Sequence, residues 1–364
     1  MTTNTRHIDP IPMIKVHGSH REMGRQIGEA FQEQIHHHIN NTHTLIDASF
    51  TTLELTWTGA QNQARKYMPF AQERYPHYVE EMIGLAEGAG VPFEDVAVVN
   101  ALEAVTIDAL HLSKCTSIAI NEQKSLNGHV YAAHNEDWLP EDEPDVYLIH
   151  AHPSVEPPFL AMTYGALLPN IGFNAYGIAQ LCDSVFPDDS RIGIPRVIVS
   201  RAVLATKTPG DAIREALVPR RAAGYNHLLV HESGELYNVE VSARRYAVLF
   251  SMNGYLTHTN HYLDPNMQSI EVDSDELVGT RVRYFRANRL LSQVDKHSLE
   301  SIQNIQRDHI NYPNSICNHA EDVLTPLDRE KTVNALIIDL TERAMHIAWG
   351  NPCLNLYHTY YLDA

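Results

Sequence analysis

Cysteine is scarce in this sequence, and its few cysteines form no recognisable metal or redox motif. The 364 residues include four of them, with no C-x-x-C pair: Cys115, Cys182, Cys317 and Cys353. Cysteines spaced this widely are typical of free thiols in a reducing compartment, rather than of a disulfide framework or a zinc knuckle. We therefore expect a cytoplasmic protein with free thiols. We also expect no cofactor and no metal ion.

Long apolar runs are missing as well. No stretch approaches the roughly eighteen apolar residues of a membrane-spanning helix. The first residues, MTTNTRHIDPIPM, lack the apolar segment and cleavage site of a signal peptide, and the last, YHTYYLDA, match no short targeting tail. These absences predict a soluble chain with no membrane partner.

Basic residues are outnumbered by acidic ones. Lys and Arg total 27 and Asp and Glu total 45, which gives a formal net charge of −18 at pH 7. A field of this sign repels phosphate backbones, so nucleic acid is an unfavourable partner, and it mildly favours an amine as substrate. The hydrophobic share of 44% is enough for a large core.

Residues 18–110 have the pattern of helices. Ser19 and Glu22 form the capping-box pair that starts a helix. Gly24 and Gly28 lie together on one face, where they let a neighbouring backbone come close. Apolar residues repeat every four positions on another face, at Met23, Ile27, Phe31, Ile35 and Ile39.

The pattern changes to strands at Cys115. Strand-like runs cover 115–120, 129–138, 145–152, 159–165, 170–181, 225–250 and 333–350, and helical patterns cover 194–217, 279–294 and 298–310. Asn127-Gly128 and Ser233-Gly234 are hairpin signals. Strands that follow one another through tight turns predict largely antiparallel sheets. We expect an α+β fold in which two sheets pack face to face with helices outside.

Cys115 is a candidate nucleophile. Thr116 and Ser117 supply hydroxyl groups beside it, and Asp137 follows at the end of the next predicted strand. A hairpin between the two strands brings the thiol and this carboxylate to one rim of the sheet. The alternative is that Cys115 is a small buried core residue, which is the usual role of a free cysteine.

A second polar cluster, LTHTNHYLD, ends a later strand. The side-chain amide of Asn260 is suited to stabilising an oxyanion. The alternatives are turn chemistry for Asn260 and ordinary core packing for His258 and His261.

The 22 histidines suggest few sites. His36–His43 falls on a predicted helix, and we expect it to form a solvated face. His150 and His152 point to one side of a strand, as two metal ligands do. His134 is a possible general base for Cys115.

Five motifs in order resemble one enzyme family. They are VHGSHREMGRQIGE, then KCTSIAI with HVYAAHNEDW, then HTNHYLD, SICNH and GNPC. Together they resemble the acyl-coenzyme A:6-aminopenicillanic acid acyltransferase family of N-terminal nucleophile hydrolases, which includes N-β-alanyl-dopamine hydrolases. The resemblance spans residues from about 14 to 360.

The resemblance implies a four-layer αββα fold and a precursor that cuts itself at Lys114–Cys115. Residues 1–114 would form a helical leader, and residues 115–364 a catalytic chain of 364 − 114 = 250 residues. The two chains would stay associated as one globular domain. A homo-oligomer is possible.

The resemblance also implies residue roles. Once Cys115 is N-terminal, its own amine takes the thiol proton, Asp137 holds that amine, and Asn260 stabilises the oxyanion. The resulting thioester is resolved by water or by an amine, and we favour hydrolysis of a small N-acyl amine. Supporting hydrogen bonds are assigned to Ser117, Asn135, His258 and Ser315.

Two residues depart from the family pattern. Lys114 stands where glycine is usual, and lysine tolerates the strained backbone of self-cleavage less well. Asn318 stands where a basic residue is usual, which disfavours anionic substrates. Two other hypotheses remain: a metal-dependent amidohydrolase using His150 and His152, and an uncleaved relative that only binds a ligand.

Overall fold

The fold is built around two β-sheets that face each other. The computed structural model describes residues 6–7, 9–106, 114–272, 276–320 and 329–363. The eight-stranded sheet runs in space through β1 (Met13–Gly18), β4 (Val146–Pro153), β5 (Phe159–Tyr164), β6 (Ile171–Asn174), β7 (Ile178–Asp183), β8 (Tyr225–His231), β9 (Leu236–Val241) and β10 (Tyr246–Phe250). The six-stranded sheet runs through β11 (Tyr255–His258), β2 (Thr116–Ile120), β3 (Tyr131–Trp138), β12 (Lys331–Asp339), β13 (Ala344–Trp349) and β14 (Tyr357–Tyr361).

Strand pairing is almost entirely antiparallel. Among the described strands, every paired neighbour is antiparallel except β1, which lies parallel to β4. Gly234 has a φ of +93° in the turn between β8 and β9, as the Ser233-Gly234 signal predicts. The largely antiparallel α+β fold expected from the sequence is confirmed.

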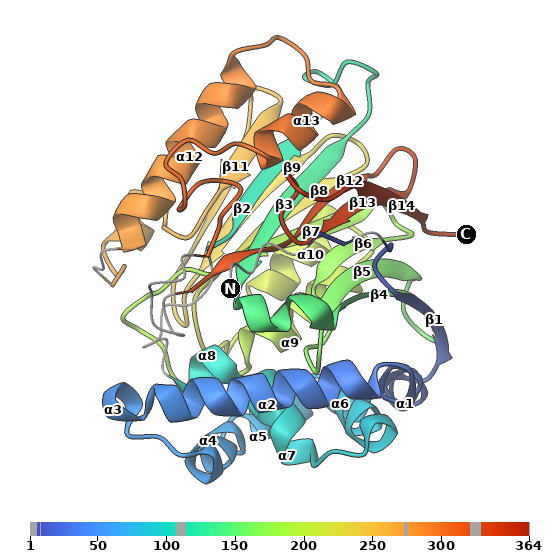
Figure 1. The fold of residues 1–364 in the computed structure, drawn as a ribbon, viewed down its shortest axis with the longest axis vertical. Helices are drawn as coiled ribbons and strands as arrows, with labels where there is room; N and C mark the ends of the chain where they lie inside the picture. The colour runs from blue at the N-terminus through green and yellow to red at the C-terminus, as the bar shows by residue number, and fades with distance from the viewer. Residues whose placement is uncertain (1–5, 8, 107–113, 273–275, 321–328, 364) are drawn as a thin grey trace.

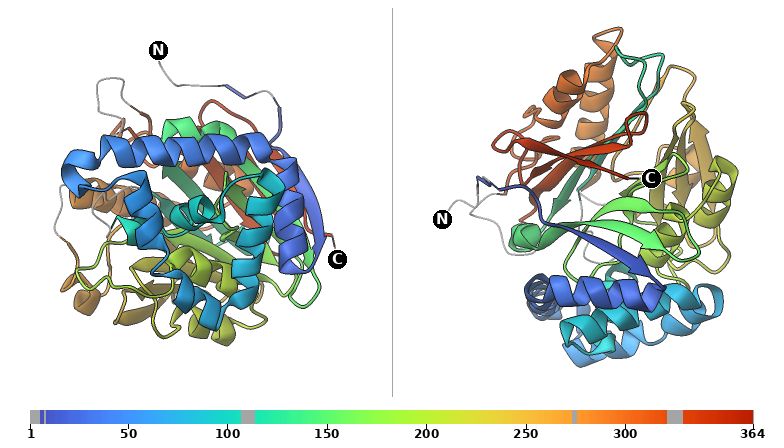
Figure 2. Two further views of the ribbon diagram at one scale, coloured as in Figure 1. Left: turned by 90° about the horizontal axis from the view of Figure 1, so that it is seen from below. Right: turned by 90° about the vertical axis from the view of Figure 1, so that its right-hand side faces the viewer.

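A helical layer covers the outer face of each sheet, as Figures 1 and 2 show. Helices α12 (Glu276–Ser292) and α13 (Leu299–Gln306) pack on the six-stranded sheet, where Leu291, Ile302 and Ile305 share a core with Ile118 and Ile337. Helices α9 (Arg196–Leu204) and α10 (Pro209–Ala216) pack on the eight-stranded sheet. The order of layers is therefore αββα, as predicted.

The N-terminal helices form a further layer below both sheets in the view of Figure 1. They are α1 (His20–Ala30), α2 (Gln32–Ala48), α3 (Phe50–Leu53), α4 (Trp57–Ala64), α5 (Met68–Arg74), α6 (Pro76–Ala89), α7 (Phe93–Val99) and α8 (Leu102–Val105). Two short helices lie elsewhere, the 3-10 helix η1 (Pro140–Asp145) and α11 (Pro265–Gln268). Ser19 caps α1 through the predicted capping box with Glu22.

The helical interpretation of residues 1–114 needs one correction, because β1 lies within this segment. This strand pairs with β4 from the later part of the chain, so the segment adds an edge strand to the eight-stranded sheet. The solvated face predicted for His36–His43 is also wrong for His38, which is buried against Tyr164. Within the part of the chain that the structure describes, no helix is both long and apolar enough to cross a membrane.

Backbone contact joins α1 to α6. A Cβ atom at Gly24 would lie 2.0 Å from the backbone oxygen of Glu81, and one at Gly28 would lie 2.4 Å from that of Leu85. Gly84 and Gly88 of α6 face the backbone of α1 in the same way. The close approach predicted for Gly24 and Gly28 is therefore confirmed.

We predict that Gly24→Ala lowers the free energy of unfolding by about 1–3 kcal/mol or more, because overpacked atoms must force the helices apart. Gly279→Ala is the matched control, since Gly279 lies in α12 with no atom within 4 Å of the added Cβ. Alanine is favoured over glycine in a helix by about 1 kcal/mol, so the control should be neutral or slightly stabilising. Urea midpoints measure both, and equal midpoints for the two variants would contradict the contact.

Candidate active site

The site lies where three segments of the six-stranded sheet end together. Cys115 directly precedes β2, which lies between β3 and β11. The register sets Thr116 opposite Asn135 and Ser117 opposite His258. The predicted nucleophile Cys115, the end of β3 at residues 135–137 and the segment 258–261 after β11 are therefore brought together.

Asn260 and Arg283 surround the backbone of Cys115. The Cys115 backbone N–H donates to Asn260 Oδ1 at 2.7 Å, and Arg283 donates to the Cys115 carbonyl oxygen and, at 2.9 Å, to the same Oδ1. Asn260 is held in turn by Thr280, whose Oγ1 accepts from its backbone N–H at 2.7 Å, and by the Ser184 carbonyl, which accepts from Nδ2 at 3.1 Å. The sequence analysis missed Arg283, which is one of several arginines along α12 and belongs to no motif.

The thiol of Cys115 faces the space between the two sheets. Its Sγ lies 3.8 Å from Glu136 Oε2, and this oxygen lies 2.8 Å from His134 Nε2. His134 Nδ1 contacts Ser117 Oγ at 2.9 Å, and that hydroxyl donates to Asp183 Oδ1 at 2.8 Å. The carboxylate beside the thiol is thus Glu136, to which the sequence analysis gave no role.

Asp137 lies on the opposite face of β3, because side chains alternate along a strand. Thr332 donates to its Oδ1 at 2.6 Å, and its buried Oδ2 has no hydrogen-bond partner among the described residues. Burial raises the pKa of this carboxyl well above its usual range, although the nearby Arg283 charge acts against the increase. The Asp137 backbone carbonyl accepts from the backbone N–H of Lys114 at 3.4 Å, so Asp137 adjoins the bond before Cys115.

Asn135 and Ser315 support the loop that follows α13. Asn135 Nδ2 donates to the carbonyls of Gln306 and Ile316 at 3.0 and 2.8 Å. Ser315 Oγ donates to the Cys317 carbonyl at 2.6 Å. Lys114 Nζ lies 3.3 Å from Glu330 Oε2, which holds the residue before the cysteine against the start of β12.

His258 is buried between two acidic side chains. Its Nδ1 lies 3.5 Å from Asp183 Oδ2, and its Nε2 lies 3.0 Å from Glu240 Oε1. Burial alone would lower the pKa of this imidazole, but the two carboxylates outweigh burial and raise it to about 9. A protonated His258 therefore balances negative charge beneath the site.

A small pocket opens beside Glu136. Its walls come from both parts of the chain, on either side of Lys114. The N-terminal part contributes His38, Val99, Leu102 and Glu103, and the later part contributes Glu136, Trp138, Tyr164, Leu167, Asn170, Ser184, Val197 and Tyr225. Glu136, which lines this pocket, lies 3.8 Å from the Cys115 thiol.

Three groups of side chains bring metal-ligating atoms together among the described residues. They are Cys115, His134 and Glu136; His20, His77 and Glu156; and His309, Cys317, His319 and Cys353. The Nε2 atoms of His150 and His152 lie 3.1 Å apart, but neither residue belongs to one of these described groups. The histidine pair named for a metal-dependent amidohydrolase thus gains no third ligand within the described part of the chain.

Comparison with known proteins gives one family match. The model of the acyl-coenzyme A:6-aminopenicillanic acid acyl-transferase family matches residues 123–353. The chain is 23% identical over 345 residues to the 40 kDa form of such an acyltransferase from Emericella nidulans, covering 93% of this chain and 92% of that protein. It is 24% identical over 224 residues to the beta-alanyl-dopamine/carcinine hydrolase of Drosophila melanogaster, covering 56% of each.

Two solved structures have weaker similarity. A variant of the conjugated bile acid hydrolase from Clostridium perfringens has a TM-score of 0.46 at 14% identity, covering 68% of this chain and 97% of that one. Penicillin V acylase from Agrobacterium tumefaciens has a TM-score of 0.43 at 14% identity, covering 65% of this chain and 83% of that one.

We predict that the His258 imidazole titrates near pH 9, well above the usual value of about 6.5. Because the folded-state pKa is raised, its contribution to stability is complete below pH 6.5 and is lost as the pH rises through 9. Histidine-selective NMR reports the titration, and His258→Gln identifies the resonance by its loss. The free energy of unfolding should also fall less steeply between pH 6.5 and 9 in this variant. A midpoint below pH 7 would show that the two carboxylates do not hold the proton.

Proposed function

Because this chain belongs to the acyl-coenzyme A:6-aminopenicillanic acid acyl-transferase family, we propose that it is a self-processing enzyme whose nucleophile is Cys115. Family membership makes it an enzyme that cleaves amides or transfers acyl groups. We further propose hydrolysis of a small N-acyl amine through a thioester. The observation that carries this proposal is the position of Cys115: its backbone N–H donates to Asn260, and its thiol lies 3.8 Å from Glu136, which lines the pocket.

The first proposed step is cleavage of Lys114–Cys115. The Cys115 sulfur attacks the Lys114 carbonyl carbon, the C–N bond breaks, and the acyl group moves from nitrogen to sulfur, while the proton lost by the thiol ends on the departing amine. Water then hydrolyses the thioester, which leaves a carboxylate on Lys114 and a free amine on Cys115. Glu136 is close enough to receive the thiol proton, at 3.8 Å from Sγ, and its contact with His134 keeps it oriented.

The free amine changes the chemistry of the thiol. An α-amine has a pKa of about 8, so near neutral pH a usable fraction accepts the thiol proton without a histidine. The ammonium that forms needs a negative partner, and we propose Asp137 for that role. The buried Oδ2 of Asp137, which has no hydrogen-bond partner within the described segments, supports this role, because a nearby positive charge would lower the raised pKa of its carboxyl.

Asn260 is the proposed oxyanion donor. A side-chain amide has two N–H groups, and the Ser184 carbonyl accepts one of them. The second N–H remains for the oxyanion of a tetrahedral intermediate on Cys115. Arg283, which contacts both Asn260 and the Cys115 carbonyl, adds positive charge at the same place.

The pocket supports an amide substrate that carries a positive charge. Glu103 and Glu136 give it two carboxylates, and Trp138, Tyr164 and Tyr225 give it aromatic walls. Arg196 pairs with Glu103 at 2.6 Å, whereas Glu136 contacts the His134 imidazole, the Cys115 thiol and the Tyr164 hydroxyl and no arginine or lysine among the described residues. We therefore assign Glu136 to the positive charge of the substrate. The Drosophila relative is named for β-alanyl-dopamine and carcinine, which makes N-β-alanyl aromatic amines the first substrates to test.

We predict that purified wild-type protein separates on denaturation into chains of 1–114 and 115–364, because Cys115 attacks the bond before it. Cys115→Ala should remain one intact chain, and intact-mass spectrometry reads both. Lys114→Gly should cleave faster than wild type, since glycine tolerates the strained backbone of the acyl shift. Intact chains in both wild type and Lys114→Gly would exclude self-processing.

We also predict that the wild-type protein releases free amine from an N-β-alanyl aromatic amine without any added acceptor. Asn260→Ala should lower kcat by about 10²–10³-fold, because one oxyanion donor is lost. Asn304→Ala is the matched control, an exposed asparagine on α13 outside the site. Chromatography of amine and acid products measures the reaction. Product that forms only when a second amine is supplied would instead identify an acyltransferase.

A further inference from the structure

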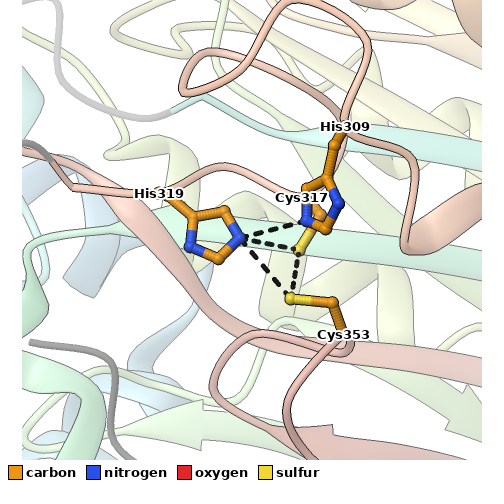
Figure 3. Close-up of side chains that lie close together, drawn as sticks. All are labelled: His309, Cys317, His319 and Cys353. Atoms are coloured by element: carbon orange, nitrogen blue, oxygen red, sulfur yellow. Dashed lines mark hydrogen bonds between the residues drawn. The ribbon is translucent and has the colours of Figure 1, made fainter.

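Four metal-ligating side chains converge on the outer side of the six-stranded sheet. His309, Cys317 and His319 lie on the loop after α13, and Cys353 lies on the turn between β13 and β14. Figure 3 shows their ring nitrogens and sulfur atoms pointing toward one common point. One ligating atom from each residue lies within 4.8 Å of all the others.

The distances within this group match a tetrahedral metal site. The Nε2 atoms of His309 and His319 are 3.2 Å apart, and the two sulfur atoms are 3.6 Å apart. Each sulfur lies 3.5 Å from His319 Nε2. A tetrahedral zinc ion, with Zn–S bonds of about 2.3 Å and Zn–N bonds of about 2.0–2.1 Å, holds its ligands about 3.3–3.8 Å apart.

We propose that His309, Cys317, His319 and Cys353 bind one zinc ion. Two thiolates with two imidazoles in tetrahedral geometry are a donor set that zinc favours. A disulfide would explain the two sulfurs alone, but the separation of 3.6 Å is far beyond the bond length of about 2.05 Å, and it would leave the two imidazoles unexplained. The sequence analysis excluded a zinc knuckle because it looked for C-x-x-C pairs, whereas these ligands come from two distant segments.

The surroundings hold the ligands in place. Asn351 Nδ2 lies 3.5 Å from Cys317 Sγ as a donor, the kind of outer hydrogen bond that orients a metal thiolate. Arg307 Nε donates to the Pro352 carbonyl at 3.0 Å, which joins the two segments that carry the ligands. Cys317 and His319 are buried and His309 is exposed, so an ion can enter from the His309 side.

This zinc ion has a structural role. Four protein ligands complete the tetrahedron, so no position is left for a substrate. The site also connects to the candidate active site: the Asn318 backbone N–H donates to Thr332 Oγ1 at 2.9 Å, and Thr332 donates to Asp137 at 2.6 Å. Zinc would therefore fix the loop on which the environment of Asp137 depends.

The test is the metal content of the full-length protein after incubation with zinc chloride and removal of unbound ions. We expect about one zinc ion per wild-type chain by mass spectrometry of the metal, and at least a tenfold loss in Cys353→Ser. Cys115→Ala is the matched control: it also removes one cysteine, but it should keep its zinc whether or not the chain processes itself. Replacing zinc with Co²⁺ should give the visible absorption of a tetrahedral thiolate site in wild type and not in Cys353→Ser.

A second ligand variant distinguishes loss of zinc binding from loss of folding. His309→Ala removes an exposed ligand, so it should fold as judged by circular dichroism and still lose zinc at least tenfold. The proposal is overturned if wild type holds less than about a tenth of an equivalent of zinc, or if both ligand variants keep the wild-type amount.

Discussion

The position of β2 between β3 and β11 is the constraint on which the site depends. Antiparallel pairing on both sides fixes the register of β2, and a shift of one residue would turn each of its side chains to the other face. In this register Cys115 meets Asn260 on one side and Glu136 on the other. The backbone hydrogen bonds of β2 with β3 and β11 thus bring the thiol of Cys115, the amide of Asn260 and the carboxylate of Glu136 together.

The site also depends on compensation of the negative charges that are buried between the two sheets. Asp183, Glu240 and Glu136 are buried near one another between the sheets, and isolated carboxylates there would be costly. His258 lies between two of them, and Ser117 and His134 link Asp183 to Glu136. Ser117 and His258, expected to support catalysis, are therefore members of a polar network that makes a charged site tolerable between two apolar sheets.

Local patterns in the sequence predicted much of this fold. Features that depend on contacts between distant parts of the chain could not be predicted in this way. The capping box at Ser19 and the glycine face at Gly24 and Gly28 depend on neighbouring residues, so they were readable. Strand β1 was not predicted, because its partner β4 lies more than a hundred residues away in the sequence. At the site, the motifs named Cys115 and Asn260, but strand alternation, which places Glu136 rather than Asp137 beside the thiol, was not considered. The contacts of Arg283 with Cys115 and Asn260, and the proximity of Cys353 to His309, are produced by the fold and have no local pattern in the sequence.

The pocket wall shared by residues before and after Lys114 has a further consequence. His38 and Glu103 face Glu136 and Tyr225 across one cavity, so cutting the chain between them would turn that cavity into a junction of two polypeptides. The pairing of β1 with β4 and the contacts of the N-terminal helices would then act as subunit contacts. Substrate binding would then depend on the concentration of the cleaved enzyme, because the pocket is complete only while the two fragments are associated. At sufficient dilution the fragments would separate and the pocket would lose one of its walls, although each fragment would remain chemically intact.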